Sequence, residues 1–479
     1  MKTNEEPINE EQNLIHKLKK DIENKEKQLK KQQEIIAELK ENSDAQEIQI
    51  RSLQNIIDSL TIQQEAVRAN CSRLETSWSY RIGKAITAPA AIVAEKYRNI
   101  KDSELIKSSI LFDSDWYLQK YRDVKKSKKD PALHYVQFGW KEGRNPSQAF
   151  DTKKYLDMVP EAGILKTCPL VHYIKHRNSV NNTMIRQLKF IEERGINKKQ
   201  IKQAIDAFKE TGISSEDRGS QHKITISLTS YPARLKDIKY GIFSLMNQTV
   251  KPDRIVLWLG KDKFPNGDQN LPDDIKKLQQ HGLTVKYTKD LCAYTKLIPS
   301  LHEYPDDIIV TADDDIYYDA DWLEQLLNEH KNNKDCVIAH RAHKISFSDE
   351  NLASYNEWEH EINGPSESAF NFLTGVGGVL YPPGIFHKDI LKEDIFMKLS
   401  PKNDDIWFWG MLVLNGKKIR VPENNKANLK YVNPESELGL NEIPTLQAQN
   451  CGQNRNDIFL KNMTDYYPDI IKILKEENK

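Results

Sequence analysis

The sequence predicts an α/β fold with a mostly parallel sheet for its C-terminal half, preceded by an N-terminal coiled coil and a small, mainly α-helical repeat region. Three observations support this prediction. Apolar residues recur every seven positions near the N-terminus, a motif recurs after 38 residues, and strand-like and helix-like runs alternate from residue 223 onward. A chain of 479 residues is also too long for one ordinary domain. We expect these segments: 1–76 coiled coil, 77–110 amphipathic linker, 111–180 two helical repeats, 181–221 helical linker, and 222–479 the α/β domain.

The overall composition excludes several classes of protein. Basic and acidic residues each total 70, so no net charge draws the chain to nucleic acid. The five cysteines have no CxxC spacing, which argues against a zinc site or a disulfide framework and indicates a reducing compartment. The N-terminus lacks the apolar core of a secretory signal, and no run reaches the roughly 20 apolar residues that span a bilayer. We therefore expect a cytoplasmic protein.

Residues 1–76 carry the spacing of a left-handed coiled coil. One register runs from Ile15 and Ile22 to Ile57, and a second register, three residues later, runs from Leu18 to Leu74. Isoleucine at the first register with leucine at the second favours a parallel dimer, so we expect a homo-oligomer. A long solitary helix is the alternative, and the sequence does not decide whether the coiled coil pairs with itself or with a partner.

The segment after the coiled coil contains a short apolar run, Ala85–Ala94, flanked by Arg81, Lys84, Lys96 and Arg98. Such a segment can lie on an anionic membrane surface, which would place the protein peripherally at the inner face of the cell membrane. A linker helix packed on the next domain explains the same pattern. The sequence leaves both interpretations open.

An internal repeat follows, in which matched residues are separated by 38 positions. The pairs are Phe112 with Phe150, Tyr117 with Tyr155, Pro131 with Pro169, His134 with His172, and Tyr135 with Tyr173. A fixed period with matched aromatic residues indicates one small helical unit used twice. We interpret the histidines as packing residues rather than ligands.

The C-terminal half alternates between strand-like and helical runs. The predicted strands are Lys223–Ser230, Arg254–Gly260, Gly282–Asp290 and Asp307–Ala312. This alternation is typical of a parallel sheet covered on both faces, in which ligands bind beyond the carboxyl ends of the strands. Residues at those ends are therefore the first candidates for a functional site.

Three adjacent aspartates, Asp313, Asp314 and Asp315, follow the fourth predicted strand. Neighbouring carboxylates repel one another, so the cluster is either a solvated turn or a cation site. Its position at a strand end favours the cation. Hard oxygen ligands at this spacing suit Mg²⁺ or Mn²⁺, which are commonly completed by substrate phosphates.

A second acidic pair and a glycine-rich stretch lie further along the chain. Asp404 and Asp405 precede an aromatic run at a predicted helix start, where one of them is either the N-cap or a general base for an incoming hydroxyl. The stretch "FLTGVGGVLYPPG" contains Gly375, Gly377 and Gly378, which form either the floor of an acceptor pocket or a plain tight turn.

Several motifs in order resemble the GT-A glycosyltransferases, in particular the inverting, family 2-like enzymes of bacterial surface polysaccharide synthesis. They are "LTSYPAR", "NQTVKPDRIVLWL", "YTKLIPSL", "TADDDIYYDADWL", "TGVGGVLYPP" and "NDDIWFW", all between residues 223 and 460. The coiled coil and the repeats are similar to the accessory regions of such enzymes. The resemblance implies a GT-A, Rossmann-like domain that acts as a hexosyltransferase.

The resemblance also implies roles for single residues. Those implied to bind the nucleotide-sugar are Thr229, Ser230, Tyr231, Arg234, Lys296, Asp313 and Asp314. Asp315, with Asp313, would hold Mn²⁺ or Mg²⁺. Gly377, Gly378 and Trp407 would contact the acceptor. Asp405, or in its place Asp404, would be the base.

One feature departs from the family pattern. Many relatives supply a histidine metal ligand after the base, whereas the last histidine here is His387. Asn450, Asn454 and Asp457 lie at the approximate place. The identity of a third protein ligand for the metal ion is therefore left open by the sequence.

We expect metal-dependent, inverting transfer of a sugar from a nucleotide donor, with UDP favoured, to a hydroxyl of a growing cell-surface polysaccharide or glycolipid. A sugar nucleotidyltransferase is an alternative, but it needs a glycine-rich, basic loop after the first strand, and "TSYPARLK" offers none. The second alternative is a non-catalytic coiled-coil scaffold with a degenerate transferase domain. The sequence does not identify the donor sugar, the acceptor or the linkage.

Overall fold

The computed structural model describes residues 78–178, 183–216, 222–426, 428–438 and 454–477, with short helical pieces between 19 and 65. The chain divides into two compact units, 1–188 and 189–479. The expected coiled coil lies almost entirely outside the described residues and stays a prediction. Among the described residues, no helix has the length and apolar character needed to cross a membrane.

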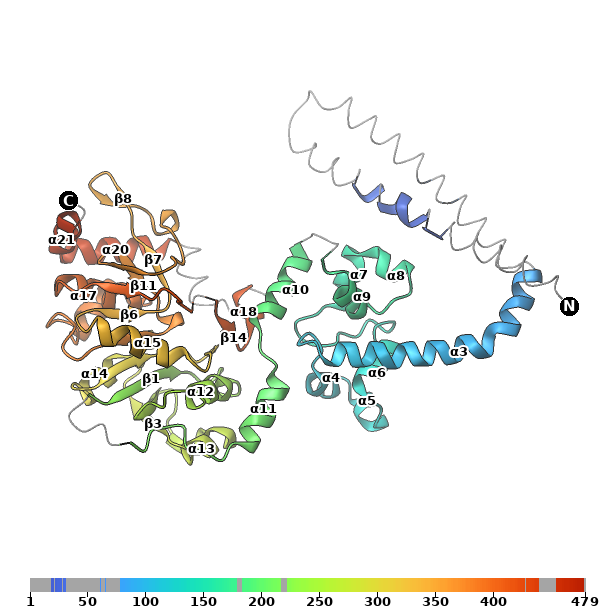
Figure 1. The fold of residues 1–479 in the computed structure, drawn as a ribbon, viewed down its shortest axis with the longest axis horizontal. Helices are drawn as coiled ribbons and strands as arrows, with labels where there is room; N and C mark the ends of the chain where they lie inside the picture. Colours follow the sequence, from blue (N-terminus) through green and yellow to red (C-terminus); the bar gives the residue numbers. More distant parts are fainter. Residues whose placement is uncertain are drawn as a thin grey trace, which may run out of the picture. The chain divides into compact units, whose positions relative to one another are not determined.

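The first unit is helical (Figure 1). Its elements are α3 (Trp78–Lys107), α4 (Ser114–Lys120), α5 (Arg122–Ser127), α6 (Pro131–His134), η2 (Tyr135–Gly139), α7 (Thr152–Met158), α8 (Pro160–Ile164) and α9 (Pro169–His176). The C-terminal part of α3 packs on α6, η2 and α9 and buries Ser103 and Ile106. Earlier in α3, Val93 and Tyr97 are exposed. The C-terminal end of the linker segment thus packs on the repeats that follow it.

The two repeats make the same contacts. The hydroxyl of Tyr117 lies 3.1 Å from Nδ1 of His134, and that of Tyr155 lies 3.0 Å from Nδ1 of His172. An aspartate caps the first helix of each repeat, and the hydroxyls of Tyr135 and Thr152, 2.8 Å apart, join one repeat to the other. These contacts give both histidines a structural role.

The second unit is built on an eight-stranded sheet with the order β10-β13-β6-β12-β4-β1-β2-β3. Its strands are β1 (Ile224–Ser230), β2 (Arg254–Gly260), β3 (Leu283–Thr288), β4 (Ile308–Thr311), β6 (Val337–Ala339), β10 (Ser366–Ser368), β12 (Val379–Tyr381) and β13 (Ile419–Val421). β1, β2, β3 and β4 pair in parallel, which confirms the predicted α/β class and all four predicted strands. β12 is antiparallel to both β4 and β6, and β10 is antiparallel to β13.

Three short ribbons and a set of helices complete the unit. The ribbons pair β5 (Ile316–Tyr317) with β14 (Lys430–Tyr431), β7 (Ala342–Lys344) with β11 (Asn371–Leu373), and β8 (Phe347–Ser348) with β9 (Asn351–Leu352). Among the described residues, α10 (Thr183–Arg194) crosses the boundary between the two units, and the α-helices after it are α11 (Lys198–Ala207), α12 (Ile238–Met246), α13 (Asp273–Gln279), α14 (Ile298–Glu303), α15 (Trp322–Asn332), α16 (Glu393–Leu399), α17 (Asp404–Leu414), α18 (Pro434–Glu437), α20 (Arg455–Tyr466) and α21 (Asp469–Glu477).

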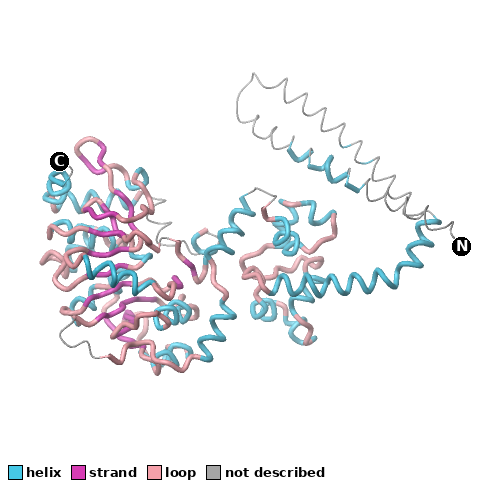
Figure 2. The backbone as a smooth tube through the Cα atoms, in the orientation of Figure 1, coloured by secondary structure: helices cyan, strands magenta, loops and turns pink. Residues whose placement is uncertain are grey.

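Strands and helices pack together in the second unit (Figure 2), and its described apolar residues include two large hydrophobic cores. Side chains alternate along β4: Ile309 belongs to the core with α17, α20 and α21, whereas Ile308 and Val310 belong to the core with α12, α13 and α15. β1 breaks this symmetry, because its second face carries the buried polar residues Thr225 and Ser227. A buried hydroxyl needs a partner, so these positions point to a polar element packed on this face of β1.

The glycines expected to contact an acceptor have packing roles in the fold. A side chain at Gly377 would place its Cβ 2.7 Å from the Cβ of Arg341. At Gly378, φ is +94° and a Cβ would lie 2.3 Å from Cζ2 of Trp322. The indole of Trp322 donates to the Gly377 carbonyl at 2.8 Å, so this turn is shaped around Trp322.

We predict that Gly378→Ala lowers the free energy of unfolding by about 3 kcal/mol or more, because it combines a positive φ with a clash in the core. Gly384→Ala is the matched control, since Gly384 has a φ of +69° but open space around it. The control should cost only about 1–2 kcal/mol of backbone strain. Urea unfolding measures both, and equal losses would contradict the role given to Trp322.

Candidate functional site

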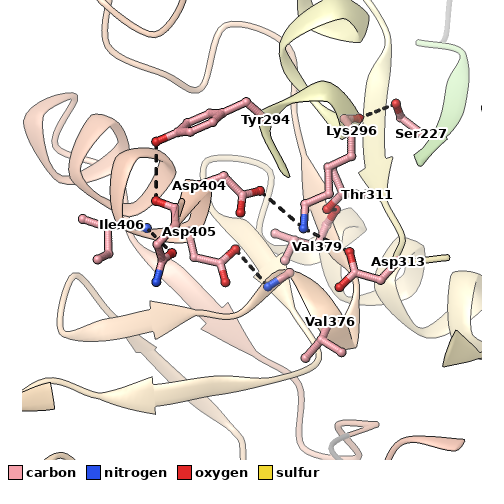
Figure 3. Close-up of polar contacts among 12 residues, drawn as sticks. Ser227, Tyr294, Lys296, Thr311, Asp313, Val376, Val379, Asp404, Asp405 and Ile406 are labelled. Carbon is pink, nitrogen blue, oxygen red and sulfur yellow. Dashed lines mark hydrogen bonds and ion pairs between the residues drawn. The ribbon is translucent and has the colours of Figure 1, made fainter. Parts of the chain in front are cut away.

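The candidate site lies where the parallel strands end. Asp313, Asp314 and Asp315 follow β4, and Arg234 follows β1, which pairs with β4 in parallel register. Lys296 ends the short 3₁₀-helix η4 (Cys292–Lys296). Asp404 and Asp405 form the first turn of α17, and Gly375 begins the turn η6 (Gly375–Gly377) that leads into β12. Lys296, Asp313 and the pair Asp404 and Asp405 come from distant parts of the sequence and lie side by side (Figure 3).

Arg234 holds one half of the cluster. Its Nη1 lies 2.5 Å from Oδ1 of Asp314 and 2.8 Å from Oδ2 of Asp315. The hydroxyl of Ser230 donates to the other oxygen of Asp314 at 2.5 Å. Each oxygen of the buried Asp314 thus has a partner inside the protein, so this residue anchors the arginine.

Asp315 is more accessible than Asp314, with 23% of its side chain exposed against 6%. Burial raises the pKa of the Asp315 carboxyl to about 7. The repulsion of Asp314 and Asp313 adds to this rise, and the attraction of Arg234 opposes it. Such a group has excess negative charge around it, and a further cation would favour its ionised form.

Lys296 holds the other half of the cluster. Its ammonium lies 3.0 Å from Oδ1 of Asp313 and 3.3 Å from Oδ2 of Asp404, and the side chain is almost completely buried. Burial alone would lower the pKa of Lys296, but Asp313, Asp404 and Asp405 raise it well above its ordinary value. The lysine is therefore a permanent cation between the strand-end aspartates and α17.

The main chain of Lys296 is fixed from the sheet. The hydroxyl of Ser227, on the polar face of β1, donates to the Lys296 carbonyl at 2.5 Å. Ser227 and Ser300 share a hydrogen bond of 2.7 Å, and the indole of Trp258 donates to Ser300 at 2.7 Å. The polar residue in β1 thus anchors the segment that delivers the ammonium.

Asp404 and Asp405 differ in their surroundings. The N-cap of α17 is Asn403, whose side chain accepts from the Ile406 amide at 3.3 Å, so neither aspartate is the cap. Asp405 Oδ1 accepts the Gly375 amide at 3.1 Å, while Asp404 faces Lys296. Burial and the neighbouring Asp404 raise the pKa of Asp405 to about 7, against the attraction of Lys296. Asp405 can therefore exchange a proton near neutral pH.

Gly375 leaves the room that this arrangement needs. A Cβ at this position would lie 2.5 Å from Nζ of Lys296 and 3.1 Å from Oδ1 of Asp405. The turn is also tied to the strand end, because the hydroxyl of Tyr318 accepts the Asp313 amide at 2.8 Å and donates to the Val376 carbonyl at 3.2 Å. A glycine in a motif suggests close approach, but only the fold shows that lysine and carboxylate are the neighbours.

The other predicted site residues differ in their exposure and in their contacts. Tyr231 is partly exposed, with the guanidinium of Arg234 5.4 Å from its ring centre. Thr229 uses its hydroxyl to donate to the Trp258 carbonyl at 2.9 Å. Trp407 is fully buried and donates its indole N–H to Ile390 at 3.1 Å. We therefore correct the prediction that Trp407 contacts an acceptor, because the apolar face of α17 turns it into the core.

Of the residues considered as a third metal ligand, Asp457 is engaged elsewhere in the fold. Asp457 accepts hydrogen bonds from the hydroxyl of Ser354 and the amide of Tyr355 at 2.8 and 2.7 Å, which fixes α20 to a loop. Asn454 precedes α20 in a left-handed conformation, and Asn450 lies outside the described residues. Asp457 is therefore better explained as a structural contact.

The donor set fits a divalent cation in part. Within the described residues, no group of three or more histidine, cysteine, aspartate or glutamate side chains has the arrangement of a metal site. Five aspartate carboxylates nevertheless surround two cations, Arg234 and Lys296, which leaves an excess of negative charge. Asp313 and Asp315 could supply two hard oxygen ligands to Mg²⁺ or Mn²⁺, with substrate phosphates and water completing the shell.

The chain matches no protein-family model and no curated protein sequence. Similar solved structures include CMP:2-keto-3-deoxy-manno-octonic acid synthetase complexed with CTP, at 13% identity over 42% of this chain and 89% of that one, with a TM-score of 0.26. An inositol-1-phosphate CTP transferase from T. maritima has 14% identity over 42% and 84% of the chains and a TM-score of 0.24. Mannosyltransferase PcManGT from Pyrobaculum calidifontis, in complex with GDP-Man and Mn²⁺, has 10% identity over 58% and 80% and a TM-score of 0.29. Scores this low carry no argument about fold or activity, which rest on the strand order and the site.

We predict that Asp405→Asn stabilises the protein at high pH. The folded state raises the pKa of this carboxyl to about 7, so its contribution to stability is present below the unfolded pKa of about 4 and is lost as the pH rises through about 7. The variant should be more stable than the parent by roughly 1–3 kcal/mol at about pH 8 and equal to it at about pH 4. A difference in unfolding free energy that does not change with pH would contradict this assignment.

Proposed function

We propose that residues 189–479 transfer a sugar from a nucleotide-sugar donor to a hydroxyl of an acceptor. The observation that carries this proposal is the junction at Lys296 between the acidic end of β4 and the acidic first turn of α17. The aspartates at the end of β4 suit a nucleoside diphosphate and its cation. The aspartates in the first turn of α17 offer a proton acceptor beside that site. A donor phosphate and an acceptor hydroxyl need these two functions next to each other.

Each half of the cluster has a part in this reaction. The guanidinium of Arg234, at the carboxyl end of β1, can face the donor diphosphate from its side of the site. A divalent cation held by Asp315, with Asp313, would neutralise the negative charge that grows on the leaving group. Tyr231, partly exposed beside Arg234, is in a position to contact the nucleotide base.

Asp405 is the proposed base. It takes the proton of the acceptor hydroxyl as that oxygen attacks the anomeric carbon of the donor sugar. The new carbon–oxygen bond forms as the bond to the diphosphate breaks, and the diphosphate leaves with that electron pair. This single displacement inverts the anomeric centre. A carboxyl with a pKa of about 7 is suited to this task near neutral pH.

The class of donor and acceptor rests on the sequence motifs. They favour a UDP-sugar and a growing surface polysaccharide or glycolipid. The nucleotidyltransferase alternative requires a loop that binds a triphosphate after β1. The segment after β1, "TSYPARLK", contains no glycine, which favours sugar transfer.

The full chain should bind UDP in calorimetry with Mn²⁺ and much more weakly without it, and Asp315→Ala should lose at least about tenfold of the metal-dependent affinity. Asp319→Ala is the control, since Asp319 is an exposed acid four residues further on. UDP binding that is equal in both variants would rule out Asp315 as the metal holder. Stronger binding of CTP or UTP, with release of pyrophosphate from a sugar phosphate, would favour the nucleotidyltransferase.

We predict that Asp405→Asn keeps UDP affinity but lowers kcat for transfer by about 10²–10⁴, the usual contribution of a general base. A screen of nucleotide-sugars against extracted glycolipid acceptors supplies the assay. Transfer at the parent rate would show that another group takes the proton.

A further inference from the structure

Lys296 lies at a position that the proposed reaction does not require for donor binding. Its ammonium is enclosed by Asp313 on one side and Asp404 on the other, at 3.0 and 3.3 Å. The sequence motif implies a contact with the donor, yet the group is nearly inaccessible and its charge is already used inside the protein. A cation held in this way acts on its carboxylate neighbours (Figure 3).

We propose that Lys296 is a positioning residue that keeps Asp404 as its charged partner and thereby leaves Asp405 as the carboxylate that receives the acceptor's proton. This inference rests on the proposed function and refines it. Two adjacent aspartates in one helical turn are chemically equivalent until something distinguishes them. Lys296 does so, because Asp404 faces the ammonium while Asp405 turns to the Gly375 amide.

The geometry around Lys296 supports a fixed role. Its carbonyl is held by Ser227, so its backbone cannot shift without breaking a buried hydrogen bond. Gly375 fits against the ammonium so closely that a Cβ there would lie 2.5 Å from Nζ. These contacts fix the position of the Lys296 ammonium, which lies between the donor side and the acceptor side of the proposed site.

The titratable groups that face Asp405 come from four elements. They are Asp404 on α17, Lys296 and Tyr294 on η4, Asp313 after β4, and Tyr381 on β12. Burial raises the pKa of both tyrosines well above the ordinary value, so they stay neutral. The charged groups that act on Asp405 are thus Lys296 and the two acids Asp404 and Asp313. Burial raises the pKa of Asp404 as well, and the attraction of Lys296 opposes that rise and favours the ionised form.

The test is the pH dependence of kcat for two variants with opposite expected shifts. Lys296→Met removes an attractive charge, so the acid limb should move to higher pH by about one unit. Asp404→Asn removes a repulsive charge, so the limb should move to lower pH while transfer continues. Lys286→Met is the control, because Lys286 pairs with Glu303 on the edge of the sheet and should leave the profile unchanged.

Calorimetry with UDP separates this role from donor binding. If Lys296 only positions Asp404, Lys296→Met should not weaken UDP binding, because the variant frees Asp313 for the cation, whereas loss of a charge-assisted contact with the diphosphate would weaken it. A large loss of UDP affinity with an unmoved pH profile would overturn the proposal and make Lys296 a donor contact. Loss of activity in Asp404→Asn equal to that in Asp405→Asn would also overturn it, because the two aspartates would then share one role.

A substrate-free readout keeps the inference separate from the proposed function. Carboxyl ¹³C NMR of protein labelled at aspartate, with Asp405→Asn to assign the signal, follows the titration of Asp405 directly. Its midpoint should rise in Lys296→Met and fall in Asp404→Asn, whether or not a sugar acceptor has been found. An unmoved midpoint in a folded Lys296→Met variant would refute the positioning role, whereas failure to transfer any sugar would refute only the proposed function.

Discussion

The site depends on burying one ammonium group. A buried charge is tolerated only when opposite charges and hydrogen bonds surround it, and Lys296 meets this condition through Asp313 and Asp404. The requirement extends into the scaffold. Ser227 is a buried polar residue of β1 whose hydroxyl holds the lysine backbone, and position 375 is a glycine because a larger residue would displace the ammonium. Strand, turn and helix are thus fitted around one charge.

The cluster is not neutral by itself. Two cations face five aspartate carboxylates, and burial holds the pKa of both Asp315 and Asp405 at about 7. Such crowding costs stability, and proteins retain it where substrate or metal binding makes use of the charge. A cation with a diphosphate would relieve the crowding at Asp315, and transfer of a proton would relieve it at Asp405. The electrostatic imbalance in the folded protein therefore matches the chemistry proposed for it.

Much of the scaffold could be predicted from the sequence, because long apolar strands leave a strong pattern. β1 to β4 were expected within two residues of their ends, and the position of Asp313 at a strand end follows from β4. The remaining strands of the sheet, β6, β10, β12 and β13, have three residues each, too few to show a period.

The partners of each charged group could not be predicted, since they come from distant segments. Asp314 lies between two candidate ligands in the sequence, yet Ser230 and Arg234 enclose it. Asn403, not an aspartate, caps α17, and Trp407 turns inward because that face of the helix meets the core. Only the fold distinguishes Asp404 from Asp405, because the distinction is made by Lys296, more than one hundred residues earlier in the chain.

The most direct test of the central claim is a crystal structure of the protein with UDP and Mn²⁺, using the anomalous signal of manganese to locate the ion. The account predicts a manganese peak against the carboxylate of Asp315, with the diphosphate between that ion and Arg234, and Lys296 still paired with Asp404. A nucleotide bound away from the ends of β1 and β4, or Lys296 withdrawn from Asp404 to contact the diphosphate, would contradict it.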